Sequence, residues 1–424
     1  MKAGELTSTP IGVDLFAGAG GLSLGFAQAG FDVLAAVEYD PIHAATHEFN
    51  FPGCATVCRS VADIDGAYVR SHSRIGDRDV DVVFGGAPCQ GFSMIGKRAL
   101  DDPRNQLVYH FVRIVSELKP KYFVFENVRG LTVGEHKKFL DEIIEEFTSA
   151  GYQVLKDYKV LNAANFGVPQ GRQRLFLMGS RTGCPLPDYP APTHKIPGTS
   201  LDLGFLDTTP TVWDAIGDLP EANDFEELLE RDWVCAKFKS PSAYARALRQ
   251  APDSTALGLL TSSMRTIHTE LSKERFSATP HGETEEVSRF LRLDPQGLCN
   301  TIRAGTATDR GAFTSPRPIH PFSARCITVR EAARLHSYPD WFRFHVTKWH
   351  GFRQVGNSVP PLLGQAVASQ IIRKLGFEPA QIETGRVGDT SLLALKMSEA
   401  AERYDVPSNV IPQRIRKAPV ESYA

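Results

Sequence analysis

The stretch that most constrains the fold of this chain runs from Asp79 to Ser93 and reads DVDVVFGGAPCQGFS. Its first half is a short apolar run rich in valine and bounded by glycines, which is typical of a buried parallel strand. Because the glycines and Pro88 cannot continue a central strand, we predict that Cys89 lies on a tight turn just past the carboxyl end of that strand. Open α/β sheets bind their ligands at this edge.

Cys89 has two interpretations. A lone cysteine after a strand is more often a small buried apolar residue than a nucleophile. A thiol on a Gly/Pro turn that is followed by a Gly/Ser-containing loop is, however, accessible on one side. This setting favours a reactive thiolate.

The composition predicts two lobes in a protein of the cytoplasm. The chain has 424 residues, which is longer than one typical domain, and its 42% hydrophobic content is enough for a full core. The net charge of −2 argues weakly against a nucleic-acid partner, although basic residues can gather on one face while the acidic stretch 221–232 balances the total. Seven irregularly spaced cysteines suit a reducing compartment, and with Cys54 and Cys58 as the only close pair we predict no metal site. The sequence has no signal peptide and no apolar run of membrane length, so we expect no membrane contact.

The N-terminal part predicts a strand from Ile11 to Phe16, a glycine-rich turn and a helix. Such a turn lets the backbone approach a nucleotide closely, but it also occurs in βα turns that bind nothing and in dinucleotide dehydrogenases. The pattern Asp14-x-Phe16-x-Gly18-x-Gly20-Gly21 departs from the dinucleotide spacing. A second strand, Val33 to Val37, ends at Glu38, where a carboxylate can accept hydrogen bonds from a ribose.

Two further segments carry charges next to buried strands. The strand from Lys121 to Val128 contains Glu126, whose charge is costly to bury without a partner. Arg172 and Arg174 alternate on one face at the start of the strand that continues through Met178. A structural salt bridge is the simplest interpretation of Glu126, and a solvated edge or a salt-bridge pair is the simplest interpretation of the two arginines.

The segment GGAPCQGFS, residues 85–93, resembles the nucleophile motif of the DNA cytosine-5 methyltransferases of bacterial restriction-modification systems. Further matches follow in the order of that family: the loop Asp14 to Gly21, the triplet Glu126 to Val128, the pattern Gln-x-Arg-x-Arg at 170–174, and residues 354–361. The resemblance covers most of the chain. It implies an α/β fold, with a Rossmann-like S-adenosylmethionine-dependent methyltransferase sheet and a second, smaller, irregular target-recognition domain.

The resemblance also implies roles for individual residues. Cys89 would attack C6 of a flipped cytosine, Glu126 would hydrogen-bond its ring nitrogen and exocyclic amine, and Arg172 and Arg174 would brace the site and touch the base and its phosphate. The cofactor would be S-adenosylmethionine, bound by Phe16, Gly18, Gly20, Gly21, Leu22, Glu38, Tyr39, Asp63, Ile64, Pro88, Leu107, Asn357 and Ser358.

The same resemblance implies contacts with duplex DNA. Residues 91–104 have few apolar anchors and resemble the loop that closes over DNA in the family. Met94 or Ile95 would fill the space left by the flipped base, although ordinary loop packing explains them equally well. The DNA-binding residues implied are Gln90, Ser93, Met94, Ile95, Lys97, Arg98, Thr301 and Arg303.

The chain divides into five segments. Residues 1–185 are expected to form the first part of the catalytic and cofactor-binding lobe, 186–324 the small lobe with the target-recognition region, and 325–350 a helix bridging the lobes. Residues 351–387 would return to the catalytic lobe, and 388–424 would add a helix and a tail. Thr328 and Glu331 predict a capping box at the start of a helix that reaches Pro339, with His336 in a surface or packing position.

The sequence therefore predicts an enzyme that methylates C5 of cytosine within a short, specific sequence of duplex DNA. A transfer-RNA cytosine-5 methyltransferase, a DNA-binding relative without catalysis and, least favoured, a nicotinamide oxidoreductase remain as alternatives. The expected partners are duplex DNA and, where one exists, a restriction endonuclease acting on the same site. We expect a monomer that uses no metal ion.

Overall fold

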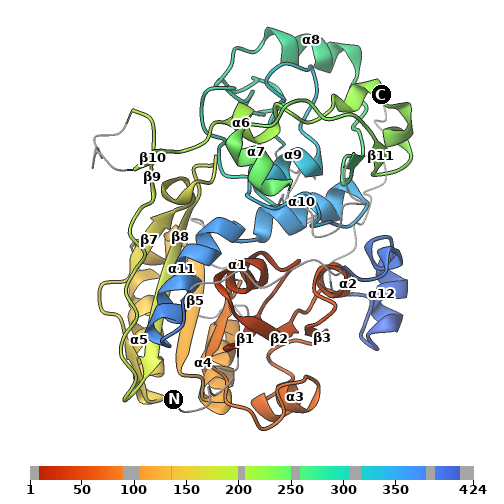
Figure 1. Ribbon diagram of the computed structural model, residues 1–424. Coiled ribbons are helices and arrows are strands. Elements are labelled where there is room, and N and C mark those ends of the chain that lie inside the picture. Colours follow the sequence, from red (N-terminus) through yellow and green to blue (C-terminus); the bar gives the residue numbers. More distant parts are fainter. Residues whose placement is uncertain are drawn as a thin grey trace, which may run out of the picture.

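The computed structural model describes residues 9–88, 106–134, 136–198, 206–249, 258–304, 317–378 and 387–410. In these ranges the chain forms one large sheet with helices on both faces and a smaller, irregular part next to it (Figure 1). The strands of the large sheet are β1 Ile11–Leu15, β2 Asp32–Val37, β3 Ala55–Val57, β4 Val82–Gly85, β5 Tyr122–Val128, β6 Tyr152–Val154, β7 Lys159–Asn162 and β8 Gln173–Arg181.

The strand order defines a doubly wound sheet. The order is β3-β2-β1-β4-β5-β8-β6, with β7 paired to β8. Strands β1 to β5 are parallel to one another, whereas β8 runs antiparallel to β5. The winding direction reverses between β1 and β4, and this switch point is where such sheets bind ligands. The predicted α/β fold is confirmed.

Side chains of successive strand residues alternate between the two faces of the sheet. Phe84 of β4 stacks on Phe26 of α1 with ring centroids 3.6 Å apart, whereas Phe123 of β5 stacks on Phe147 of α5 at 3.8 Å on the opposite face. The helices around the sheet are α1 Gly21–Ala29, α2 Pro41–Asn50, α3 Gly66–Ser71, α4 Gln106–Leu118, α5 His136–Ser149 and α11 Pro361–Lys374, with 3-10 turns η2 Arg129–Thr132 and η3 Ala163–Phe166. None of the helices in the described ranges has the length and apolar character needed to span a membrane.

The segment from Tyr152 to Leu161 forms two short strands, β6 and β7, with a break between them. Val154 pairs with Gly179 and Lys159 pairs with Phe176, so five steps along this segment face three along β8. The two extra residues bulge outward at the exposed pair Lys156 and Asp157. The bulge interrupts the ladder.

The smaller part consists of short elements. Thr328 and Glu331 form the predicted capping box at the start of α9. The helix ends at Arg334 and does not reach Pro339 as predicted, because Ser337 adopts a φ of +64° and a proline disfavours helical backbone in the residue before it. The elements are β9 His194–Lys195, β10 Asp207–Thr208, α6 Val212–Ile216, η4 Ala222–Asp224, η5 Glu226–Leu229, β11 Val234–Cys235, α7 Ala243–Leu248, β12 Leu259–Leu260, α8 Glu270–Ala278, α9 Val329–Arg334 and α10 Lys348–Asn357, and η8 Thr390–Leu393 and α12 Met397–Arg403 follow α11.

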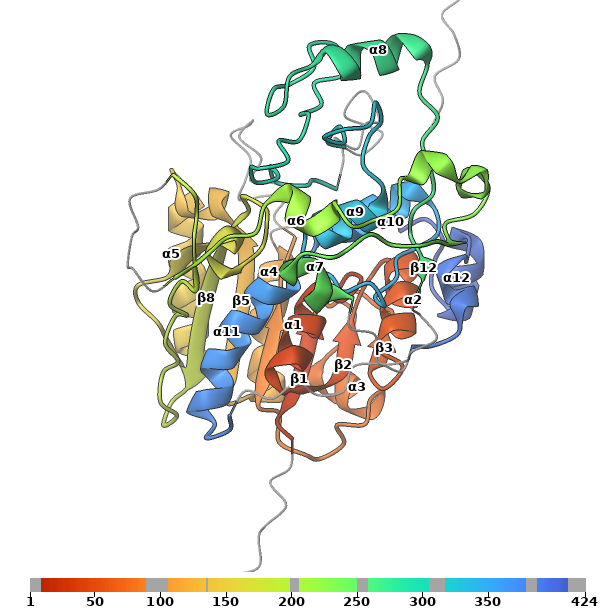
Figure 2. The same cartoon turned by 45° about the horizontal axis from the view of Figure 1, so that its top comes forward.

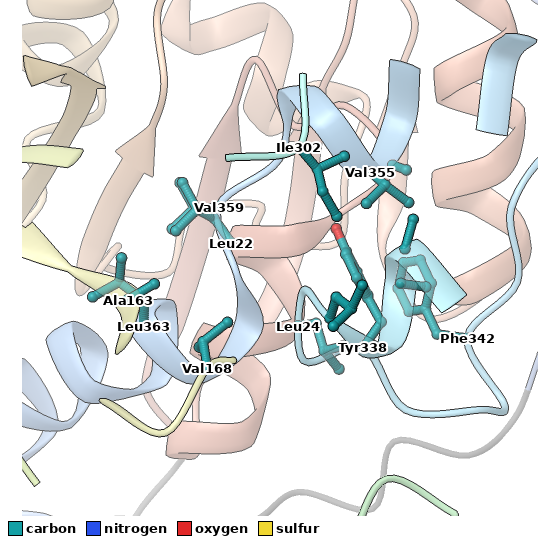
Figure 3. Packing of buried hydrophobic residues seen from close by; sticks show 14 of the residues in the cluster. Leu22, Leu24, Ala163, Val168, Ile302, Tyr338, Phe342, Val355, Val359 and Leu363 are labelled. Atoms are coloured by element: carbon teal, nitrogen blue, oxygen red, sulfur yellow. The ribbon is translucent and has the colours of Figure 1, made fainter. Parts of the chain in front are cut away.

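One hydrophobic core joins the sheet to the smaller part. Figure 2 shows α11 beside α1, with the smaller part lying above both. A Cβ atom at Gly25 would lie 2.7 Å from the Gln365 backbone nitrogen, so only glycine lets α1 approach α11 this closely. Leu22 of α1, Ile302 and Tyr338 belong to the same cluster, as Figure 3 shows. The glycine loop before α1 is therefore held by residues from both parts of the chain.

Candidate active site

The loop after β1 is open on one side. Gly18 and Gly20 have φ values of +58° and +103°, and Phe16, at +62°, is strained in a way that glycine is not. A Cβ atom at Gly18 would meet nothing within 4 Å, whereas one at Gly21 would lie 2.5 Å from the Val359 carbonyl oxygen. The loop is thus packed at Gly21 and accessible to a ligand at Gly18.

Glu38, at the end of β2, faces this loop. Its Oε2 accepts a hydrogen bond of 2.7 Å from the Gly18 backbone N–H, and its Oε1 accepts one of 2.8 Å from that of Asp40. Burial and the neighbouring Asp40 raise the pKa of Glu38 to about 7. A carboxylate has about four acceptor positions, so two remain for the hydroxyls of a ribose. Tyr39, beside it, is 51% exposed.

A buried polar chain lies beneath the glycine loop. Ser23 Oγ donates to Asp14 Oδ2 at 2.6 Å and lies 3.0 Å from His47 Nε2, and His47 Nδ1 lies 3.2 Å from Thr56 Oγ1. Asp14 is 1% exposed, and its Oδ1 has no hydrogen-bond partner among the described residues. Burial raises the pKa of Asp14 to about 8, so the carboxyl group holds its proton at neutral pH.

Replacing Asp14 with asparagine should change how stability depends on pH. The pKa of Asp14 rises from its ordinary value of 3.8 to about 8 on folding, so the folded protein binds an extra proton between these values and loses stability as pH rises through that window. Asparagine still accepts from Ser23 but does not ionise. Urea unfolding should show that Asp14→Asn flattens the decline by up to about 1.4 kcal/mol per pH unit. Parallel profiles for the two proteins between pH 5 and 8 would contradict this assignment.

The loop that carries Asp63 and Ile64 is fixed by a residue that the motif analysis missed. Arg113 of α4 donates from Nη2 to the carbonyl oxygens of Val61 and Ile64, at 2.7 and 2.8 Å. Asp63 is exposed at this position, and Ile64 is buried. Leu107, at the start of α4, is half-buried. Arg113 follows an apolar helical pattern without any motif of its own, so only the tertiary structure identifies its role.

Glu126 lies against the turn that leads to Cys89. The side chain is 8% exposed, and a Cβ atom at Gly86 would collide with Glu126 Oε2. Asn127 donates to the Ala87 carbonyl oxygen at 3.2 Å and so fixes the same turn. Burial raises the pKa of Glu126, and the nearby arginines oppose this effect.

The turn is described as far as Pro88, which is half-buried. The predicted nucleophile and most of the predicted DNA-binding residues lie outside the described residues. These are Cys89, Gln90, Ser93, Met94, Ile95, Lys97 and Arg98.

The two arginines of the Gln-x-Arg-x-Arg pattern have different surroundings. Arg174 Nε forms a 2.9 Å ion pair with Glu126 Oε1. Arg172 is completely buried and donates to the carbonyl oxygens of Ile302, Gly356 and Ser358 at 2.7 to 2.9 Å. This geometry favours the bracing role predicted for Arg172 over direct contact with a base, because its terminal nitrogens are already bonded within the protein. We therefore treat Arg172 as a positioning residue.

Replacing Arg172 with methionine should destabilise the protein. The substitution keeps much of the side-chain volume but leaves three buried carbonyl oxygens without their donor, and we expect the free energy of unfolding to fall by about 3 kcal/mol. Arg181→Met, at the exposed last position of β8, serves as the control and should change stability by less than about 1 kcal/mol. Equal losses in urea unfolding would show that Arg172 is no interlobe brace.

His336 and Gln170 extend this bracing network. Gln170 donates to His336 Nδ1 at 3.0 Å, so His336 Nε2 carries the proton and donates to the Ser358 carbonyl oxygen at 3.1 Å. Of the two positions predicted for His336, packing is confirmed and surface is wrong, because its side chain is completely buried. The Ile302 backbone N–H donates to Gln170 Oε1 at 3.1 Å and ties the smaller part to the same pattern.

The remaining predicted residues gather around this network. Thr301 Oγ1 donates to the Gly171 carbonyl oxygen at 2.7 Å, and a Cβ atom at Gly356 would collide with the backbone of Arg303. Asn357 is exposed and Ser358 is half-buried. The described residues contain no group of three or more His, Cys, Asp or Glu side chains that could hold a metal ion.

The sheet order and the loops at the carboxyl ends of its strands define the fold of S-adenosylmethionine-dependent methyltransferases. Residues 12–373 match the model of the family described as C-5 cytosine-specific DNA methylase. The chain belongs to this family, and it is a DNA cytosine-5 methyltransferase of the restriction-modification type.

Several relatives are similar over most of their length. Type II methyltransferase M.XorII of Xanthomonas oryzae pv. oryzae is 61% identical over 417 residues, covering 96% of this chain and 95% of the relative. Type II methyltransferase M1.HphI of Haemophilus parahaemolyticus is 35% identical over 366 residues, covering 85% of this chain and 86% of the relative. The crystal structure of a candidate DNA modification methyltransferase encoded within an E. coli prophage has a TM-score of 0.70 and 33% identity, covering 87% of this chain and all of that one.

Proposed function

We propose that this enzyme transfers a methyl group from S-adenosylmethionine to C5 of a flipped cytosine in a short sequence of duplex DNA, through a covalent bond between Cys89 and C6. One observation carries the proposal. Glu126, paired with Arg174, lies directly on the turn that ends at Pro88, next to Cys89 in the sequence. The carboxyl group of Glu126 therefore lies beside the segment that leads from β4 to Cys89, which supports a role for both groups in one site.

The chemistry follows from the weak reactivity of cytosine. The thiolate of Cys89 forms an S–C6 bond, and a hydrogen bond from protonated Glu126 to N3 favours the shift of the ring electrons toward C5. Burial shifts the pKa of Glu126 upward, in the direction that favours a proton-donating carboxyl group, while Arg174 and Arg172 oppose this shift. C5 then forms its bond to the methyl carbon as the bond from that carbon to the donor sulfur breaks, and the sulfur keeps the electron pair. A base removes the C5 proton, and the electron pair of the broken C–H bond expels the sulfur of Cys89 from C6.

The residues around the glycine loop fit S-adenosylmethionine. The open side of Gly18 admits a ligand against the backbone, Glu38 offers acceptors to ribose hydroxyls, and Tyr39, Asp63 and Ile64 would contact the adenine. When bound, this cofactor supplies a methyl group on a positively charged sulfur, which an electron-rich carbon accepts readily. We also assign Phe16, Gly20, Gly21, Leu22, Pro88, Leu107, Asn357 and Ser358 to this pocket.

The target base must leave the duplex, because its reacting atoms are inaccessible within the stack. We assign Thr301 and Arg303, together with the residues of the 91–104 loop, to the DNA. Residues 186–324 would read the target sequence, between the two parts of the catalytic lobe at 1–185 and 351–387. The bonds from Arg172 to Ile302 and Gly356 support this division, because they hold the recognition segment against the catalytic lobe. We expect a monomer, and a paired restriction endonuclease is consistent with the Type II relatives.

The proposal is tested by transfer of labelled methyl groups to genomic DNA, followed by base-resolution mapping of 5-methylcytosine. Transfer-RNA is assayed in parallel, and M.XorII is mapped under the same conditions. We expect label in DNA at a single short sequence. Reactions without S-adenosylmethionine should give no 5-methylcytosine at that sequence. Label confined to transfer-RNA, or to cytosines in all contexts, would contradict the proposal.

A further inference from the structure

The C-terminal segment, residues 387–410, lies beyond the part of the chain that matches the family model, yet it is docked on the catalytic lobe. Figure 1 shows α12 of this segment alongside α2, next to the edge strand β3. We refer to residues 387–410 as the C-terminal clamp. β3 has only three residues and pairs with β2 alone, so this edge of the sheet has little support of its own.

The clamp is anchored first by apolar packing. Leu392 and Leu393 form a buried cluster with Ala45 and Phe49, which both belong to α2. Leu393 is completely buried. The Gly388 backbone N–H donates to the Phe49 carbonyl oxygen at 2.7 Å, at the C-terminal end of the helix. The clamp therefore packs along the outer side of α2.

A second anchor is polar. Glu48 of α2 accepts hydrogen bonds of 2.6 Å from both Arg403 and the Tyr404 hydroxyl. Arg59 donates from the same nitrogen to the Tyr404 carbonyl oxygen at 2.8 Å and to the Cys58 carbonyl oxygen at 2.9 Å. Arg59 begins the loop that leads to Asp63 and Ile64. The clamp thus also fixes the start of that loop.

A third anchor reaches the beginning of α2. His345 Nε2 donates to the Leu395 carbonyl oxygen at 3.0 Å, and the Val346 N–H donates to that of Leu393 at 2.9 Å. The chain from His345 continues into α10, whose Arg353 forms a 3.1 Å ion pair with Asp40. Asp40 caps α2 and follows Tyr39 directly. The three anchors therefore converge on the two segments that would enclose the adenine.

We propose that the C-terminal clamp is a positioning element for the cofactor: it holds α2 and the 58–64 loop at the spacing that the adenosine group requires. The inference rests on the proposed binding of S-adenosylmethionine. Coupling between two binding events is reciprocal. Cofactor binding should therefore tighten docking of the clamp by the same factor by which the docked clamp tightens cofactor binding.

Hydrogen exchange on the full-length protein tests the coupling without any mutation. Saturating S-adenosylhomocysteine should slow exchange of amides in residues 391–404 by about tenfold, within the range usual for coupled sites. Amides of α5, at the opposite edge of the sheet, serve as the internal control and should not change. Failure of the protein to bind S-adenosylhomocysteine in calorimetry overturns the proposed cofactor and this inference together. Binding with unchanged exchange in the clamp overturns the inference alone.

Leu393→Ala tests the reverse direction. This variant should raise the Kd for S-adenosylhomocysteine and the KM for S-adenosylmethionine by about tenfold, with kcat at saturating cofactor and the KM for DNA within about twofold of the parent. Leu140→Ala, at a completely buried position in α5, is the matched control and should leave the cofactor Kd unchanged. Tyr404→Phe removes only one hydroxyl and should shift the Kd in the same direction by a smaller factor, which keeps the test valid if Leu393→Ala does not fold. If Leu393→Ala made hydrogen exchange in the clamp fast but left the Kd for S-adenosylhomocysteine unchanged, the proposal would be overturned.

Discussion

Replacing Glu126 with glutamine should slow methyl transfer by about 10²- to 10⁴-fold, the usual contribution of a positioned acid or base. Glutamine preserves the volume of the side chain and can still accept from Arg174, so the fold should be retained. It cannot, however, supply an acidic proton to N3 of the cytosine. Single-turnover transfer of a labelled methyl group to duplex DNA measures the effect.

The control for this prediction is Glu145→Gln on α5, an exposed position away from the switch point. It should transfer methyl groups at the parental rate. If Glu126→Gln retained more than about a tenth of the parental rate while its cofactor Kd stayed unchanged, the acid role of Glu126 would be wrong, and the Arg174 pair would be purely structural.

Replacing Cys89 with serine should abolish turnover. A serine hydroxyl is far less acidic than a thiol, so almost none of it is ionised near neutral pH, and it adds poorly to the weakly electrophilic C6. S-adenosylhomocysteine should bind with an unchanged Kd, because none of the residues assigned to the adenosine depends on the thiol. Cys235→Ser, at an exposed position in the smaller part, is the control and should remain active. Turnover by Cys89→Ser would rule out Cys89 as the nucleophile.

Most of the fold follows from local patterns. The run before Gly85, the strand that ends at Glu38 and the Thr328 capping box are each visible in a few neighbouring residues, and the structure confirms all three. The break between β6 and β7 is different, because it is defined by pairing with β8, where five steps along one segment face three along the other. Local sequence therefore predicts that a strand exists more reliably than whether that strand is interrupted.

The environment of the site is harder to predict than its motif residues. Arg172 and Arg174 are two positions apart in the chain, but Arg172 is sealed among carbonyl groups from distant segments, whereas Arg174 pairs with Glu126. Their difference depends on Ile302 and Gly356, more than a hundred residues further along the chain. Docking of α12 on Glu48 is likewise a tertiary contact between distant residues. Such long-range contacts have no signature in a local pattern.

The covalent step at Cys89 is tested most directly with duplex DNA whose target cytosine carries fluorine at C5, once the target sequence is mapped. Fluorine replaces the proton that must leave C5, so the sulfur of Cys89 cannot be expelled after methyl transfer. We predict a protein–DNA adduct that survives denaturation, contains one added methyl group, and maps by mass spectrometry to the peptide that includes Cys89. Efficient methylation of the unmodified duplex without any adduct on the fluorinated one would contradict the mechanism.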